Sequence, residues 1–167
     1  EKKFLTTRPR GFPGIPRLIA SGEGNGEGWI VEERMAGLRM DQMISKKLSY
    51  DSRRILQDVL EQLVVLEKNG LYHNDVRVWN VLCTPEGRGR LFDFGSITEI
   101  PRDCQPPVAL GVSFLLFARD VVRHCLPEGR LHRGPGVSPT DFPSPYNVWV
   151  HSLWTKEPHA WTFGFLL

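Results

Sequence analysis

The segment 72–95 reads YHNDVRVWNVLCTPEGRGRLFDFG, and it decides how the rest of this 167-residue chain is interpreted. Within it Asp75 is followed five residues later by Asn80, and Asp93 stands thirteen residues beyond Asn80. Transfer of a γ-phosphoryl group needs a carboxylate beside the acceptor hydroxyl, and oxygen ligands that fix magnesium against a triphosphate. These three side chains can supply both, so their spacing predicts a phosphotransfer site.

Each polar residue of the segment has its own expected role. Asp75 lies in a loop between a predicted helix and a predicted hairpin, where a general base can reach an acceptor oxygen. Asn80 offers an amide oxygen that completes a magnesium shell without repulsion between carboxylates, and Asp93 offers the charged ligand. His73 is expected to order the loop by hydrogen bonding rather than to transfer protons. The predicted catalytic residues are Asp75, His73 and Asn80, and the predicted metal ligands are Asn80 and Asp93.

A purely structural interpretation of these residues is also available. Asp and Asn are common in turns, and Asp-Phe-Gly alone is a weak motif. The joint pattern is far more specific, because it combines His-x-Asp-x-x-x-x-Asn with Asp-Phe-Gly at a fixed distance across a predicted hairpin. It therefore favours the functional interpretation.

Hydrophobic periodicity and turn residues predict the elements around the segment. Apolar residues at helical spacing between Asp51, which can serve as the N-cap, and Gly70 predict a central, largely buried helix. A hairpin with strands at 81–83 and 90–92 is expected to bring Asn80 and Asp93 to one end of its ladder. Further helices are expected at 1–5, 40–48, 112–126, 146–154 and 161–167, further strands at 17–20 and 29–34, and an irregular excursion at 127–145.

The segment 21–28, SGEGNGEG, is rich in glycine. A phosphate-binding loop is one interpretation, but its two glutamates would repel phosphate and no helix is expected to follow it. A flexible hairpin loop that turns at Asn25-Gly26 is the favoured interpretation.

Composition narrows the function classes. A net charge of +2 without a continuous basic stripe disfavours nucleic-acid binding. The three cysteines form no CxxC pair, so neither a disulfide framework nor a zinc site is expected. No apolar run approaches the length of a membrane span. Trp149, Trp154 and Trp161 are expected to dock the C-terminal helices, with a base-stacking platform as the less favoured alternative.

The octapeptide HNDVRVWN at 73–80 resembles the catalytic loop of protein kinases and of the related aminoglycoside-type phosphotransferases. Asn74 stands where protein kinases usually have an arginine that pairs with an activation-loop phosphate. The resemblance therefore implies no control by phosphorylation of that loop. An APE-like motif is also missing after Asp93, which favours a carbohydrate or another small acceptor over a peptide.

The N-terminal part is similar to other kinase elements. EKKFL at 1–5 resembles the end of the αC helix, so Glu1 would match the glutamate that pairs with the phosphate-binding lysine; a solvated terminal residue is an equal alternative. IVEERMAGLRM at 30–40 resembles the strand, the hinge and the start of the helical lobe, so the backbone of Glu33 and Met35 would face the adenine of ATP. The resemblance implies ATP and Mg2+ as cofactors.

A closer resemblance includes DFPSPYNVWVHSLWTKEPHAWTFGFLL at 141–167 and covers nearly the whole chain. It is to the kinase domain of bacterial bifunctional methyltransferase-kinases that terminate O-antigen polysaccharides. It implies an α+β, protein-kinase-like fold, with 1–34 as the remnant of the smaller lobe and 35–167 as the hinge and the helical lobe. In that family the kinase phosphorylates the sugar at the non-reducing end, and methylation of this phosphate stops elongation.

The same resemblance implies a lipid-linked polysaccharide end and a polysaccharide-polymerising glycosyltransferase as partners, no nucleic acid, and a cytoplasmic location that includes the inner face of the cytoplasmic membrane. We expect the chain to be a fragment without the Gly-rich loop and the phosphate-binding lysine, and to be inactive or nearly so alone. The alternatives are a pseudokinase scaffold that binds nucleotide or an assembly partner, and a small-molecule kinase of the aminoglycoside type.

Overall fold

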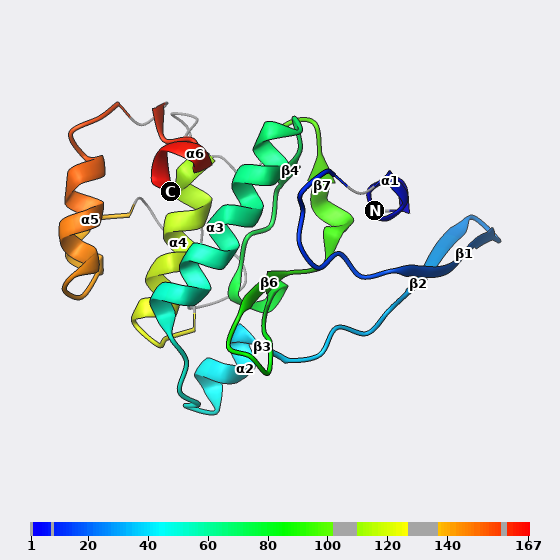
Figure 1. The fold of residues 1–167 in the computed structure, drawn as a ribbon, viewed down its shortest axis with the longest axis horizontal. Helices are drawn as coiled ribbons and strands as arrows, with labels where there is room; N and C mark the ends of the chain where they lie inside the picture. The colour runs from blue at the N-terminus through cyan, green and yellow to red at the C-terminus, as the bar shows by residue number, and fades with distance from the viewer. Residues whose placement is uncertain (1, 8, 102–109, 127–136, 158–159) are drawn as a thin grey trace.

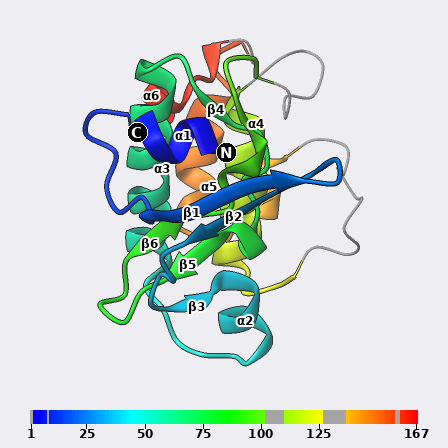
Figure 2. The same cartoon turned by 90° about the vertical axis from the view of Figure 1, so that its right-hand side faces the viewer.

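The computed structural model describes residues 2–7, 9–101, 110–126, 137–157 and 160–167. Helices α3 to α6 lie together on one side, and the β1–β2 hairpin projects from the other (Figure 1). Seen from that other side, the hairpin crosses in front of the helices (Figure 2). The elements in chain order are α1 (Lys2–Thr7), β1 (Leu18–Gly24), β2 (Glu27–Glu32), β3 (Leu38–Arg39), α2 (Met40–Ser45), α3 (Ser52–Lys68), β4 (Tyr72–His73), η1 (Val78–Asn80), β5 (Val81–Cys83), β6 (Gly89–Leu91), η2 (Phe94–Ser96), β7 (Ile97–Thr98), α4 (Leu110–Val122), η3 (Pro139–Asp141), α5 (Tyr146–Leu153) and α6 (Phe163–Leu166).

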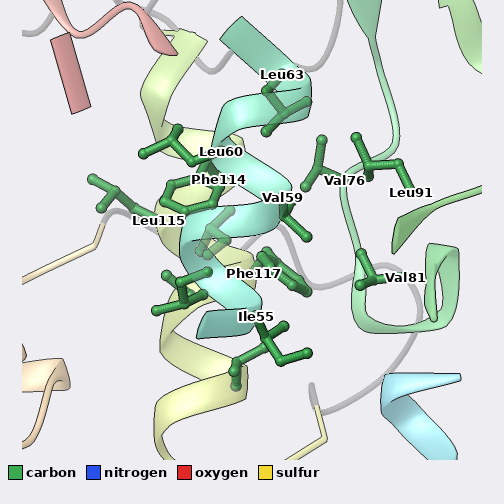
Figure 3. Close-up of a cluster of buried hydrophobic side chains, with 14 of the residues drawn as sticks. Ile55, Val59, Leu60, Leu63, Val76, Val81, Leu91, Phe114, Leu115 and Phe117 are labelled. Atoms are coloured by element: carbon green, nitrogen blue, oxygen red, sulfur yellow. The ribbon is translucent and has the colours of Figure 1, made fainter. Parts of the chain in front are cut away.

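Helix α3 is the central element, as its periodicity predicts. It begins where the Asp51 carboxylate accepts a hydrogen bond from the Arg54 amide at 3.1 Å, and it ends before Gly70, whose φ is +67°. Its apolar side chains pack between α4 and the β5–β6 hairpin (Figure 3). Burying each such side chain contributes about 1.5–3 kcal/mol, so this layer holds the fold together. The labelled core residues are Ile55, Val59, Leu60, Leu63, Val76, Val81, Leu91, Phe114, Leu115 and Phe117.

A buried polar cluster joins α3 to β6. The Asp58 carboxylate accepts hydrogen bonds from the Arg88 guanidinium and from the Gly89 amide, the latter at 2.9 Å. The Gln62 side chain donates to the Gly89 carbonyl at 2.9 Å and accepts from the Leu91 amide at 3.0 Å. Strand β6 is thereby fixed against the helix at a set register.

The strands form three small sheets. Strands β1 and β2 pair antiparallel, and the turn at Asn25-Gly26 has positive φ at both residues, as predicted. The expected loop at 21–28 is wrong in extent, because both strands continue up to the two turn residues. The second sheet has the order β3-β5-β6, and the third pairs β4 with β7. The predicted hairpin is confirmed, with Val81 opposite Leu91, although its second strand lies one residue earlier than the predicted 90–92.

The remaining helices lie near their predicted positions, and the mixed helix and strand composition is confirmed. Helices α2, α5 and α6 are shorter than predicted, whereas α1 extends beyond residue 5 and α4 begins before residue 112. Trp161 is 5% exposed, and its carbonyl accepts a hydrogen bond from the Gly111 amide of α4 at 2.7 Å, so this tryptophan docks the C-terminal segment as predicted. Trp149 is half-buried against the core. Trp154 is more exposed than expected, at 41%, and the centroid of its ring lies 4.7 Å from that of the Trp161 ring. Among the described helices none combines the length and apolar character needed to span a membrane.

Candidate active site

Asp75 lies in the loop between β4 and η1, and Asn80, the last residue of η1, contacts it directly. The Asn80 side-chain amide donates to the Asp75 carboxylate Oδ2 at 2.7 Å and to the Asp75 main-chain oxygen at 3.0 Å. Asn80 is 3% exposed, whereas Asp75 is partly exposed. Because the amide nitrogen is committed to Asp75, the Asn80 Oδ1 oxygen is the atom left to bind a cation.

His73 holds the same loop from its buried side. It is 2% exposed, and its Nε2 lies 3.1 Å from the Phe92 carbonyl oxygen, which can only accept, so Nε2 carries the proton. Its Nδ1 then accepts from the Asp75 amide at 3.4 Å. Both ring nitrogens are thus used to link the loop to the end of β6, which is the geometry of the ordering role predicted for His73.

Asp93 lies two residues beyond the end of β6, and its side chain is exposed. Its φ of 58° and ψ of 67° lie in the left-handed region, which is uncommon for a residue other than glycine. The next residue, Phe94, is fully buried, with its ring 4.7 Å from that of Phe4 in α1 and 5.9 Å from that of Phe12. Burial of Phe94 therefore helps to hold the Asp93 backbone in this conformation.

The β5–β6 hairpin places Asn80 and Asp93 at the same end of its ladder. Val81 pairs with Leu91, and beyond this pair the Phe92 amide donates to the Asn80 carbonyl at 3.1 Å. One amide oxygen and one exposed carboxylate suit Mg2+, which takes one or two protein carboxylates together with water and substrate phosphates. The described residues contain no group of three or more His, Cys, Asp or Glu that could hold a metal ion. Their donor set thus fits a cation shared with a nucleotide.

Sequence reasoning assigned no role to Arg77. Its Nε lies 4.0 Å from the Asp75 carboxylate, and its side chain is 16% exposed. A cation at this distance places positive charge beside the predicted general base, where a phosphoryl group would approach. The available signal was the position of Arg77 two residues after Asp75 within the motif.

Two residues predicted to contact the nucleotide, Glu33 and Met35, lie in the segment between β2 and β3. The Glu33 amide donates to the Arg17 carbonyl at 2.8 Å, so this amide serves the hairpin and only the carbonyl of Glu33 remains for adenine. Met35 is half-buried in the segment that leads from β2 to β3. Strand β3 pairs with β5, so this segment runs toward the strand that follows Asn80. Glu1 lies outside the described residues.

Comparison with known proteins places the chain in the protein-kinase-like superfamily. It is 34% identical over 116 residues to the serine/threonine-protein kinase PknA of Mycobacterium tuberculosis. This match covers 64% of the present chain and 26% of PknA. Over all 167 residues it is 36% identical to the O-antigen chain terminator bifunctional methyltransferase/kinase WbdD of Escherichia coli. The chain spans 23% of the length of that relative.

Solved structures give the same result. A 2.2 Å crystal structure of WbdD matches all of this chain and 33% of its own, with a TM-score of 0.80 at 32% identity. A low-resolution structure of WbdD with an ordered C-terminal bundle matches 99% of this chain and 33% of its own, with a TM-score of 0.87 at 35% identity. No protein-family model matches the chain. The resemblance to the chain-terminating methyltransferase/kinases is thus confirmed over the whole chain.

Proposed function

We propose that the protein of which this chain is part is an ATP- and Mg2+-dependent phosphotransferase that acts on a sugar hydroxyl. The observation that carries the proposal is the contact between Asn80 and Asp75. One side-chain amide holds the Asp75 carboxylate at 2.7 Å and keeps its own oxygen for a cation, at the hairpin end that also carries Asp93. A general base and two metal ligands thereby share one site.

In the proposed reaction, Asp75 accepts the proton of the sugar hydroxyl as the hydroxyl oxygen attacks the γ-phosphorus of ATP. The bond between the γ-phosphorus and the bridging oxygen breaks, and ADP leaves. When bound, Mg2+ would be held by Asn80 and Asp93 and would offset charge on the phosphates. His73 keeps Asp75 in place through the Asp75 amide, and Arg77 offsets negative charge beside it.

We infer the acceptor class from Asn74, from the lack of an APE-like motif after Asp93, and from the name of the relative, an O-antigen chain terminator. The proposed acceptor is the non-reducing end of a lipid-linked polysaccharide, presented by its polymerising glycosyltransferase. The proposed location is cytoplasmic, at the inner face of the cytoplasmic membrane.

The proposal extends to the nucleotide and to the lobes. The carbonyl of Glu33 and the backbone of Met35 would contact adenine, and Glu1 would pair with a phosphate-binding lysine. Residues 1–34 would belong to the smaller lobe, and residues 35–167 to the hinge and the helical lobe. The inactivity of these 167 residues alone stays a prediction.

The test is a transfer assay with the full-length protein, labelled ATP and three acceptors: an O-antigen oligosaccharide, a generic protein substrate and an aminoglycoside. We expect label on the oligosaccharide, loss of transfer with EDTA, and loss in Asp93→Ala. Mg2+-dependent nucleotide binding without transfer to any acceptor would instead favour a pseudokinase scaffold. Label confined to the aminoglycoside would favour a small-molecule kinase.

A further inference from the structure

Asn74 contacts the chain that follows the candidate metal ligand Asp93. Its side-chain nitrogen lies 2.9 Å from Thr98 Oγ1, 3.0 Å from the Ile100 carbonyl and 3.3 Å from the Ser96 carbonyl. The Asn74 amide also donates to the Ser96 carbonyl, at 3.4 Å. We call residues 96–100 the post-Asp93 segment. One half-buried side chain in the catalytic loop thus holds this segment at three points.

Thr98 also forms two hydrogen bonds within the post-Asp93 segment. The Thr98 hydroxyl donates to the Ile100 carbonyl at 2.6 Å and accepts from the Ile100 amide at 3.2 Å. Because this hydroxyl already donates its proton, it acts as an acceptor toward Asn74. The geometry therefore requires a donor at position 74, and the amide nitrogen of asparagine supplies it.

The Asp93 backbone needs support on both sides. A left-handed conformation costs a residue with a Cβ about 1–2 kcal/mol, and it persists only where the surrounding structure imposes it. Before Asp93, the chain is fixed by β6 and by the bond from the Phe92 amide to Asn80. After Asp93, the anchors are buried Phe94, the two-residue pairing of β4 with β7, and the Asn74 contacts.

We propose that Asn74 is a positioning residue: it clamps the post-Asp93 segment to the catalytic loop and so keeps the Asp93 carboxylate oriented toward the cation. The clamp uses main-chain carbonyls and one threonine hydroxyl, so it forms without a phosphate group. This inference rests on the proposed function, because it assigns the clamp a part in holding Mg2+ and nucleotide.

The experiment uses the full-length protein and the variant Asn74→Leu, which keeps the size of the side chain and removes the donor. The first readout is the Mg2+ concentration that gives half-maximal binding of a non-hydrolysable ATP analogue. We expect it to rise several-fold. The second readout is kcat, which we expect to fall by about 10- to 100-fold, because a displacement of about 1 Å at a site can cost that much. Hydrogen exchange at the Ile100 amide should become faster.

Two further variants separate positioning from general damage. Thr98→Val removes one acceptor and should shift the Mg2+ dependence in the same direction, by a smaller factor. Because Asn74 and Thr98 share one contact, the effects of the two substitutions in the double variant should be less than additive. The control is Asn147→Leu in α5, where the Asn147 side-chain oxygen accepts a hydrogen bond from the Val148 amide at 2.9 Å. It should lower thermal stability comparably and leave the Mg2+ dependence unchanged.

The outcomes distinguish this inference from the proposed function. A shifted Mg2+ dependence in Asn74→Leu, in a protein that transfers phosphate to no acceptor, would support the clamp and refute the phosphotransferase. An active wild-type protein in which Asn74→Leu retains its Mg2+ dependence and kcat would refute the clamp alone. Failure of the wild-type protein to bind nucleotide with Mg2+ would overturn both.

Discussion

Two polar clusters contact the same β5–β6 hairpin, and they use their polar atoms in opposite ways. In the cluster of Asp58, Gln62 and Arg88, the carboxylate and both amide atoms of Gln62 bond to other parts of the protein. In the cluster of Asp75 and Asn80, the amide nitrogen is bonded, whereas the amide oxygen accepts no hydrogen bond from the residues that the structure describes.

The difference shows how one hairpin serves both stability and chemistry. The first cluster fixes β6 and the turn against α3, so the hairpin cannot shift along the helix. That rigidity supports the end of the hairpin that carries Asn80 and Asp93, the proposed metal ligands. A polar group whose hydrogen bonds are all made within the protein has a structural role. A polar group in a rigid loop that keeps an atom without such a bond is a candidate for a chemical role.

The largest expected effect belongs to the second cluster. Asp75→Asn keeps an oxygen that can accept from Asn80 but removes the base, so kcat of the full-length protein should fall about 100- to 10,000-fold. Steady-state phosphotransfer to the sugar acceptor measures this. Asp41→Asn is the matched control, because Asp41 pairs with Arg39 at 2.8 Å in α2. Turnover within a few-fold of wild type would remove Asp75 from the base role.

The first cluster should affect stability rather than rate. Arg88→Leu leaves the Asp58 carboxylate, whose residue is 4% exposed, without its cationic partner. Since the Arg88 side chain is itself 40% exposed, we expect the free energy of opening to fall by less than it would on loss of a fully buried pair. Hydrogen exchange at the Gly89 and Leu91 amides reports it.

The matched control for Arg88→Leu is Arg54→Leu on the exposed face of α3, which should change the opening free energy by less than about 0.5 kcal/mol. Equal protection of Gly89 in wild type and Arg88→Leu would show that the ion pair contributes nothing to the hairpin. A large fall in kcat in fully folded Arg88→Leu protein would show that the first cluster also affects catalysis.

The sequence alone predicts local features of the chain better than contacts between its distant segments. The cap at Asp51, the stop at Gly70 and the turn at Asn25-Gly26 depend on neighbouring residues, and all three are confirmed. The spacing of Asp75 and Asn80 likewise predicts a site because both belong to one short loop. The predicted length of the β1–β2 strands was wrong, since cross-strand pairing outweighs the low strand propensity of glycine.

Contacts between distant segments could not be predicted in this way. Asp58 and Gln62 sit within a helix that reads as apolar, and nothing local shows that β6 approaches them. The roles of Asn74 and Arg77 depend on where the chain returns after Asp93 and on the path of the loop itself. Such roles become visible only once the tertiary structure brings the segments together.

A smaller effect is expected where β6 approaches α3 most closely. A Cβ at Gly89 would lie 2.9 Å from the Ile55 carbonyl oxygen, a main-chain atom that cannot turn away. Gly89→Ala should therefore cost about 1–2 kcal/mol of stability, measured by thermal denaturation. Gly24→Ala is the control, because its Cβ would meet nothing within 4 Å. Unchanged stability in Gly89→Ala would mean that the close approach is relaxed in solution.

The smallest effect is the pH dependence of the first cluster. Burial acts to raise the pKa of Asp58, but hydrogen bonds from Arg88 and Gly89 outweigh it and leave the pKa lowered. A lowered folded-state pKa means that the stabilisation is complete above the unfolded pKa of about 3.9 and is lost as the pH falls through the folded value. The stability difference between wild type and Asp58→Asn should therefore shrink between about pH 5 and pH 3, as measured by urea denaturation. A constant difference over this range would show that the Asp58 carboxylate does not titrate with folding, and that the contrast between the clusters rests on shape rather than on charge.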